Sequence, residues 1–252
     1  MSASGPFSLT GRTAMVTGAN TGLGQAAAIA LAAAGADIIA VGRSDPDATL
    51  NAVRKLGRSA FSLSADLSTT DPIDHIARDA QAIAPIDILV NNAGIIRRAD
   101  SEVFTEADWD LVMDTNLKSA FFLTQAIARP MLERGHGKII NIASLLSFQG
   151  GVRVPAYTAS KSGLAGVTKI LANEWAGRGV NVNAIAPGYF ETNNTEALRA
   201  DPDRSRSILE RIPAGRWGRP NDLDGAVVFL AAAASDYVHG AIIAVDGGWL
   251  AR

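Results

Sequence analysis

The stretch Thr13–Ala34 reads TAMVTGANTGLGQAAAIALAAA, and its two ends follow different patterns. Thr13–Thr17 is a short run of apolar and β-branched residues, which is typical of a strand covered on both faces. Leu23–Ala34 is rich in alanine, a strong helix former, and Gly35 follows it as the usual residue of a left-handed C-terminal turn. A glycine-rich loop joins the two. The stretch therefore predicts one strand–loop–helix unit of a parallel α/β sheet.

The same alternation continues along the chain. Short β-rich apolar runs predict six further strands, at Asp37–Val41, Ala60–Ser64, Asp87–Val90, Lys138–Ile142, Val180–Ile185 and Ile242–Val245. Alanine-rich or amphipathic segments between them predict helices at Asp47–Leu56, Ile73–Ala84, Glu106–Glu133, Ala156–Ala176 and Asn221–Ala233. Strands that alternate with helices form right-handed crossovers. We therefore expect a single-domain, Rossmann-like doubly wound fold over residues 1–252, with a seven-stranded parallel sheet between two helix layers. Ligands of such sheets bind beyond the carboxyl ends of the strands.

Composition narrows the function further. Of the 252 residues, 48% are hydrophobic and 19% are charged, with a formal net charge of −2, so nothing favours nucleic acid or an anionic membrane as partner. The chain has no cysteine and therefore no disulfide or thiolate chemistry. The N-terminal MSASGPFSLTGR lacks the pattern of a secretory signal, and Gly35 and Asp37 interrupt the longest apolar stretch, Ala26–Val41. We expect a cytoplasmic protein.

Residues 17–24, TGANTGLG, form the loop between the first strand and its helix. Glycines let the backbone turn tightly and approach a pyrophosphate, whose charge then meets the N-terminus of the helix. The spacing is Gly-x-x-x-Gly-x-Gly rather than the Gly-x-Gly-x-x-Gly of the standard dinucleotide fingerprint. The loop by itself indicates a phosphate site, with a purely structural turn as the alternative.

This loop resembles the Thr-Gly-x-x-x-Gly-x-Gly motif of the short-chain dehydrogenase/reductase family, and further matches follow in the family's order. Asp66 and Leu67 follow the third strand, Asn91-Asn92-Ala93-Gly94 follows the fourth, and Pro187-Gly188 follows the sixth. The resemblance implies that a nicotinamide dinucleotide contacts Gly18, Asn20, Thr21, Gly22, Leu23, Gly24, Asp66, Leu67, Asn92, Ala93, Gly94, Tyr157, Lys161, Pro187, Gly188 and Thr192.

The choice between NAD and NADP depends on the end of the second strand. A carboxylate there would bind both ribose hydroxyls and repel a 2′-phosphate, but this chain has Gly42 followed by Arg43. Arg43 could pair with that phosphate or be a solvated surface residue. Thr21 stands where NADP-preferring relatives often carry a second basic residue. Both cofactors remain open, with a slight lean to NAD.

Tyr157 and Lys161 are four residues apart in a predicted helix, which puts them on the same helical face. A free tyrosine ionises near pH ~10, so useful proton exchange at neutral pH requires a lower pKa. A neighbouring ammonium would lower it, and we expect Lys161 to do so. Tyr157 would then give or take a proton as hydride reaches or leaves a carbonyl carbon. The alternative is a packed tyrosine beside a surface lysine.

By resemblance, the catalytic tetrad is Asn116, Ser144, Tyr157 and Lys161. Ser144 would hold the substrate oxygen, and Asn116 would anchor a water linked to Lys161. Other chemistries lack support in the sequence. Ser144 is not in a Gly-x-Ser-x-Gly elbow, the glycine loop has no Gly-Lys-Ser/Thr ending, and the three histidines match no metal-ligand spacing.

Polar and cationic residues cluster near the expected reaction end of the cleft: Arg97, Arg98, Gln149, Arg153, Asn193 and Asn194. They suit a hydroxylated substrate whose carboxylate is clamped by a guanidinium, although some arginines could serve subunit contacts instead. Long stretches, including residues 146–151 and 245–252, resemble the sugar-acid dehydrogenases of the family. This resemblance implies oxidation or reduction of a keto-deoxy sugar acid by a homotetramer. Gluconate, another carbonyl substrate, or a catalytically silent sensor of the dinucleotide are the alternatives.

Overall fold

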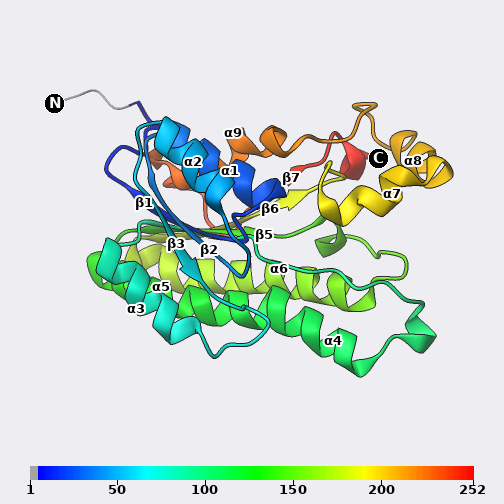
Figure 1. Cartoon of the computed structure of the whole chain (residues 1–252), viewed down its shortest axis with the longest axis horizontal. Helices are drawn as coiled ribbons and strands as arrows, with labels where there is room; N and C mark the ends of the chain where they lie inside the picture. Colours follow the sequence, from blue (N-terminus) through cyan, green and yellow to red (C-terminus); the bar gives the residue numbers. More distant parts are fainter. Residues whose placement is uncertain (1–4) are drawn as a thin grey trace.

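The computed structural model describes residues 5–252, and a seven-stranded sheet runs through its centre (Figure 1). All its strand pairs are parallel, in the order β3-β2-β1-β4-β5-β6-β7. The strands are β1 (Thr13–Thr17), β2 (Asp37–Gly42), β3 (Ala60–Ser64), β4 (Ile88–Asn91), β5 (Gly137–Ile142), β6 (Val180–Pro187) and β7 (Ile242–Val245). The predicted fold class is confirmed, and each predicted strand is present within two residues of its expected ends.

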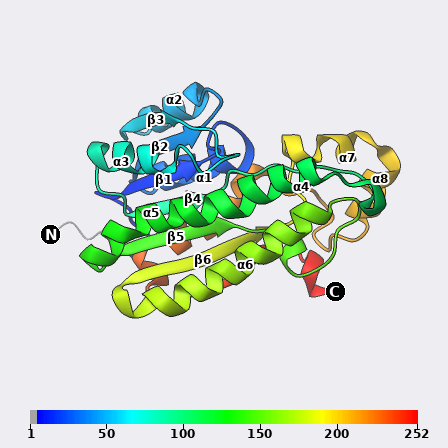
Figure 2. The ribbon, with the colours of Figure 1, turned by 90° about the horizontal axis from the view of Figure 1, so that it is seen from below.

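Helices cover both faces of the sheet. On one face lie α1 (Gly22–Ala33), α2 (Asp47–Lys55) and α9 (Asp224–Ala231), and on the other α3 (Ile73–Ile83), α4 (Glu106–Met113), α5 (Ser119–Arg134) and α6 (Pro155–Trp175). Successive residues of β1 illustrate the two layers. Ala14 and Val16 pack into the core under α1, whereas Met15 packs into the core on the opposite face. Figure 2 shows α4 and α5 end to end in one line over the second face, with α6 beside them.

The segment predicted as one helix over Glu106–Glu133 contains an irregularity. A π-helical turn, η2 (Asp114–Lys118), separates α4 from α5. Such turns insert an extra residue and are frequent at functional sites. Here the turn carries Asn116, which is 1% exposed and points into the molecule.

Two short helices after β6 lie outside the sequence prediction. They are α7 (Glu196–Ala200) and α8 (Pro202–Leu209), and the Asp201 side chain accepts hydrogen bonds from the first backbone amides of α8. Figure 1 shows both beyond one end of the sheet, near the C-terminus. Their apolar residues join a small separate core with Leu145, Ile212, Trp217 and Trp249. They therefore form a cover over the carboxyl ends of the strands.

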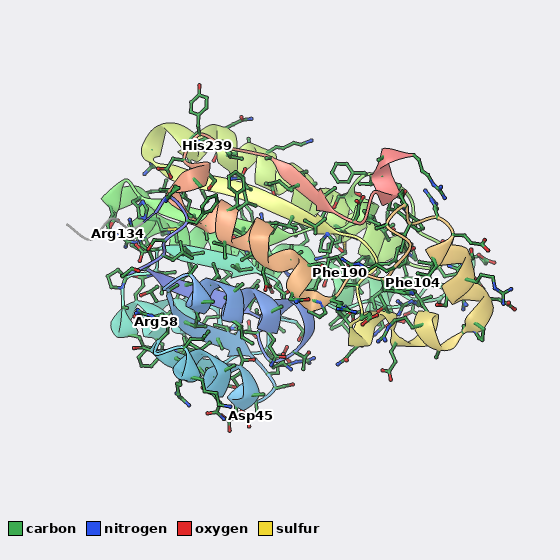
Figure 3. The ribbon with its side chains drawn as sticks, turned by 90° about the horizontal axis from the view of Figure 1, so that it is seen from above. Asp45, Arg58, Phe104, Arg134, Phe190 and His239 are labelled. Carbon is green, nitrogen blue, oxygen red and sulfur yellow. The ribbon has the colours of Figure 1, made fainter. Side chains whose placement is uncertain are left out.

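The cleft described below lies at this end. In Figure 3, Phe190 and Phe104 lie toward α7 and α8, whereas Arg134 and His239 lie at the opposite end.

The predicted helix at Asn221–Ala233 is observed as a 3₁₀ turn, η6 (Pro220–Leu223), followed by α9. Within residues 5–252, no helix is long and apolar enough to cross a membrane.

Candidate active site

Hydrogen bonds from the end of β4 hold the glycine loop. The Asn92 side chain donates to the backbone oxygens of Thr17 (3.0 Å) and Gly18 (3.1 Å). In return, the Thr17 hydroxyl accepts from the backbone amides of Asn92 (3.0 Å) and Ala93 (2.9 Å). From the other side, the Thr49 hydroxyl donates to the Ala19 oxygen at 2.7 Å. The protein's own hydrogen bonds thus fix the loop from both sides.

Backbone contacts inside this loop leave no room for a side chain at Gly24. A Cβ there would overlap the Gly18 carbonyl oxygen and lie 2.8 Å from its carbonyl carbon. Gly18 itself has a φ of 64°, a conformation that favours glycine. The first turn of α1 contains no acidic residue, and its N-cap, Thr21, makes no side-chain capping bond. The first amides of α1 can therefore bind an anion, so the loop fits a pyrophosphate.

A continuous cleft runs past this loop. Its first part has a volume of about 320 Å³ and includes the residues Gly18, Asn20, Thr21, Gly22, Leu23, Asn92, Ala93, Gly94, Ser144, Tyr157, Lys161, Pro187, Gly188, Thr192 and Asn193. Its second part, of about 270 Å³, is lined by Arg43, Asp66 and Leu67 and shares Gly18, Asn20, Ala93 and Gly94 with the first. Residues predicted from separate segments of the chain thus line one cleft.

Arg43 lies at the outer end of the cleft, and both it and Asp66 are exposed. The Arg43 Nη1 lies 3.7 Å from the Asp66 Oδ2. The backbone amide of Ser68 holds the pKa of Asp66 below its usual value, and the Arg43 charge acts in the same direction. Gly42, at the end of β2, adds no carboxylate to this end of the cleft. The local charge can therefore accommodate a phosphate.

Tyr157, Ser144 and Lys161 lie together in the first part of the cleft. Burial raises the pKa of Tyr157, while a hydrogen bond with the Ser144 side chain and the charge of Arg98 oppose this rise. The predicted lowering of this pKa by Lys161 is therefore not observed. The reason is geometric. The Lys161 Nζ lies 5.7 Å from the centroid of the tyrosine ring and donates to the Ile142 oxygen at 2.6 Å.

Lys161 is itself almost completely buried, and burial lowers its pKa to about 8. Its ammonium lies close to Asn116 across Gly94, since a Cβ on Gly94 would be 3.1 Å from Asn116 Oδ1 and 3.7 Å from Lys161 Nζ. Asn116 accepts from the Ile95 amide (2.8 Å) and donates to the Ile95 oxygen (2.9 Å). The π-helical turn thus fixes Asn116 against the loop that follows β4, next to the lysine.

A second cavity of about 320 Å³ opens onto the cleft at Ser144 and Tyr157, which line both. Its walls come from the loops after β4, β5 and β6, from α8 and from the C-terminal segment. Three arginines line it, Arg98, Arg204 and Arg211, and no Asp or Glu does. Among the described residues, none of the three arginines forms an ion pair. The cavity therefore carries uncompensated positive charge.

Some of the residues predicted to bind the substrate line the two cavities, and others lie elsewhere. Gln149 and Asn194 line the second cavity, and Asn193 lines the cleft. Arg97 instead lines the outer part of the cleft and pairs with Asp108 at 3.3 Å. Arg153 pairs with Asp100 at 3.0 Å and is among the lining residues of neither cavity. Of the three arginines in the sequence prediction, Arg98 thus lines the second cavity, and Arg97 and Arg153 do not.

The sequence prediction missed Arg204 and Arg211 because it missed α7 and α8. A signal was present. Arg204, Ser207 and Arg211 are spaced at intervals of three and four, as on one face of a helix. Arg204 and Ser207 lie on α8, Arg211 lies two residues beyond its end, and all three line the cavity. Trp249, the fourth residue from the C-terminus, was also missed as a wall of this cavity.

Comparison with known proteins agrees with this geometry. A family model described as short chain dehydrogenase matches residues 12–203. The chain belongs to the short-chain dehydrogenase family and is an NAD(P)-dependent oxidoreductase that acts on a CH–OH group. Over 248 residues it is 60% identical to the 2-dehydro-3-deoxy-D-gluconate 5-dehydrogenase of Escherichia coli, covering 98% of each chain.

Two solved structures are close to this fold. The first, with bound NADP, is of a candidate 2-deoxy-D-gluconate 3-dehydrogenase of Agrobacterium tumefaciens, 65% identical, with a TM-score of 0.93 over 98% of this chain and 99% of that one. The second is a gluconate 5-dehydrogenase of Burkholderia cenocepacia in complex with NADP and tartrate. It is 40% identical, with a TM-score of 0.94 over 99% of this chain and 99% of that one.

Proposed function

We propose that this protein interconverts a hydroxyl and a ketone on a sugar acid, as a 2-dehydro-3-deoxy-D-gluconate 5-dehydrogenase. One observation carries the proposal. A cavity with three arginines and no acidic residue opens directly at Ser144 and Tyr157, so it suits a carboxylate-bearing substrate. The names of the close relatives agree with this substrate class. Gluconate is the second candidate, since the Burkholderia cenocepacia relative is a gluconate 5-dehydrogenase.

The nicotinamide cofactor, bound by the glycine loop and the cleft, supplies or accepts the hydride. The protein's own side chains handle the proton. Ser144 holds the substrate oxygen, and Tyr157 donates a proton to that oxygen during reduction or removes it during oxidation. Because burial raises the pKa of Tyr157, the phenol is protonated at neutral pH and ready to donate. Oxidation requires the phenolate, which the hydrogen bond with Ser144 and the positive charge of Arg98 favour.

Lys161 and Asn116 complete the proposed machinery. Lys161 keeps positive charge beside the Tyr157 ring, and its Nζ bond to the Ile142 oxygen fixes its position. Asn116 holds the loop at Ile95 against the π-helical turn. We propose that the gap between Asn116 and Lys161 is the place of a water that passes protons on. This role follows from the family resemblance, and it is supported by the presence of both side chains next to Gly94, within 4 Å of the place that a Cβ there would take.

For the cofactor we propose that the cleft accepts NADP as well as NAD. The slight lean to NAD has no support, because both solved relatives above carry NADP. Arg43 is exposed and free to turn toward a 2′-phosphate, since its contact with Asp66 at 3.7 Å is long.

We also propose that the protein is cytoplasmic and forms a homotetramer. Trp109, Phe122 and Ile170 are partly exposed apolar residues on α4, α5 and α6, which supports assembly through those helices.

Substitution of Tyr157 by phenylalanine tests the proposal. The change removes only the hydroxyl, so we expect turnover of sugar acids to fall by about 10²- to 10⁴-fold while NADPH still binds. Tyr237→Phe is the matched control, because Tyr237 is fully exposed and lines none of the cavities described above. Rates would be followed by the absorbance of the reduced nicotinamide, with a panel of keto-deoxy and aldonic acids and both cofactors. Undiminished turnover in Tyr157→Phe would refute the mechanism. Wild-type protein that binds NADPH but turns over none of these acids would refute the proposed activity and would indicate a sensor of the dinucleotide instead.

A further inference from the structure

Arg211 differs from the other two arginines of the second cavity in how firmly it is held. Its guanidinium stacks on the indole ring of Trp249, with 4.1 Å from the guanidinium carbon to the ring centroid. Its Nη2 donates to the Gln149 Oε1 at 3.3 Å, and the Trp249 Nε1 donates to the same oxygen at 3.3 Å. The amide of Gln149 thus joins the arginine to the ring on which it lies.

The support beneath Arg211 is rigid. Trp249 packs against Tyr189 (4.7 Å between ring centroids), and Tyr189 packs edge-to-face against Trp217 (5.6 Å). Both tryptophans are buried. The Asp246 carboxylate accepts from the backbone amides of Gly248 (2.8 Å) and Leu250 (2.9 Å), which fixes the C-terminal turn that carries Trp249. The guanidinium plane is therefore set by packed aromatic residues and not by a flexible side chain alone.

Arg98 and Arg211 also lie at different depths in the cavity. The Arg98 Nη2 donates at 2.9 Å to the oxygen of Asn194, a residue that lines both the cleft and the second cavity. Arg211 instead contacts Gln149 and Trp249, which line the second cavity but not the cleft. Arg98 is thus nearer the reacting end of the cavity than Arg211. In a sugar acid oxidised at C5, the carboxylate and the reacting carbon are at opposite ends of the carbon chain.

We propose that Arg211 binds the carboxylate of the sugar acid, with Gln149 and Trp249 as the residues that position it. This assignment rests on the proposed function and names the group that selects an acid over a neutral polyol. One Nη2 bond goes to Gln149, so the remaining guanidinium N–H groups are available for a carboxylate. Holding the side chain in place before binding reduces the entropy lost when the substrate arrives. No such support is seen for Arg204, whose guanidinium makes no hydrogen bond or ion pair with the rest of residues 5–252.

Arg211→Gln is the direct test, with Arg206→Gln as the matched control. Arg206 lies on α8 but is exposed, pairs with Asp203 and lines neither cavity. For the sugar acid that wild type turns over best, we expect Arg211→Gln to raise KM by about 10- to 100-fold, with kcat within about threefold. The KM for the matching neutral polyol should stay unchanged, and Arg211→Lys should restore part of the affinity. The dissociation constant of NADPH and the Tm show whether each variant is folded.

Gln149→Glu supplies a second test that keeps Arg211 in place. The new carboxylate would lie where the amide oxygen now accepts from Arg211 and would pair with the guanidinium. We expect KM for the sugar acid to rise here as well, and Gln149→Met to have a smaller effect. An unchanged KM in Arg211→Gln and in Gln149→Glu, with wild type active on sugar acids, would overturn the assignment alone. A wild-type enzyme inactive on every sugar acid would overturn the proposed function and the assignment with it.

Discussion

Substitution of Gly24 by alanine tests whether the glycine loop has to be as tight as the structure shows. The added Cβ would overlap the Gly18 carbonyl oxygen and would lie 2.8 Å from the Gly18 carbonyl carbon. Both are backbone atoms, so no side-chain rotation relieves the overlap, and the loop has to move away from α1. Overpacking of this kind costs about 1–3 kcal/mol, and we expect the upper end because the obstacle is backbone.

This cost can appear in folding or in cofactor binding. If the full cost of about 3 kcal/mol destabilises the complex with NADPH, the dissociation constant of NADPH rises by about 100-fold, because each factor of ten corresponds to about 1.4 kcal/mol. If it falls on folding, Tm drops by roughly 6–12 °C, at about 2–4 °C per kcal/mol for a chain of this size. The two measurements together should account for about 3 kcal/mol.

The assay is a fluorescence titration with NADPH, combined with thermal unfolding in the absence of cofactor. Gly225→Ala is the matched control, because a Cβ at Gly225 in α9 meets no atom within 4 Å. Alanine there should stabilise the helix slightly, by about 0.5–1 kcal/mol. The reasoning is refuted if Gly24→Ala binds NADPH within twofold of wild type and unfolds within about 2 °C of it.

Two further predictions concern charge. Burial lowers the pKa of Lys161 from 10.5 to about 8, so between these pH values the unfolded chain holds a proton that the folded chain has lost, and stability rises with pH through this window. From pH 8 to pH 10.5, the free energy of unfolding of wild type should therefore increase by about 3 kcal/mol relative to that of Lys161→Met. Chemical denaturation at a series of pH values measures both, and parallel dependences on pH in the two proteins would contradict the prediction. Arg43→Ala should raise KM for NADP by about 10-fold and leave KM for NAD unchanged, as measured by initial rates with each cofactor. Equal effects on both would show that Arg43 does not contact the 2′-phosphate.

Local sequence predicted the sheet and the glycine loop well. The strands are short apolar runs, and their ends were found because burial on both faces leaves a continuous signal. The helix over Glu106–Glu133 was only partly right, because the π-helical turn at Asp114–Lys118 depends on packing of Asn116 against Ile95. Nothing in the local pattern distinguishes such a turn from continuous helix.

The pKa of Tyr157 shows a second limit. The spacing of Tyr157 and Lys161 gave their shared helical face correctly, and both line the cleft. The spacing could not give the direction in which the Lys161 ammonium points, which a carbonyl on β5 decides. It also could not give the degree of burial that raises the pKa of the Tyr157 phenol.

By itself, the sequence determined the order of strands and helices, the tight loop at Gly18–Gly24 and the family, because each depends on residues that are near neighbours in the chain. Tertiary structure alone decided which arginines reach the substrate cavity. Arg97 and Arg98 are adjacent, yet the Arg97 side chain pairs with Asp108 and the Arg98 side chain donates to the Asn194 oxygen. Arg211 meets Gln149 and Trp249 only because the fold brings three distant segments to one end of the sheet.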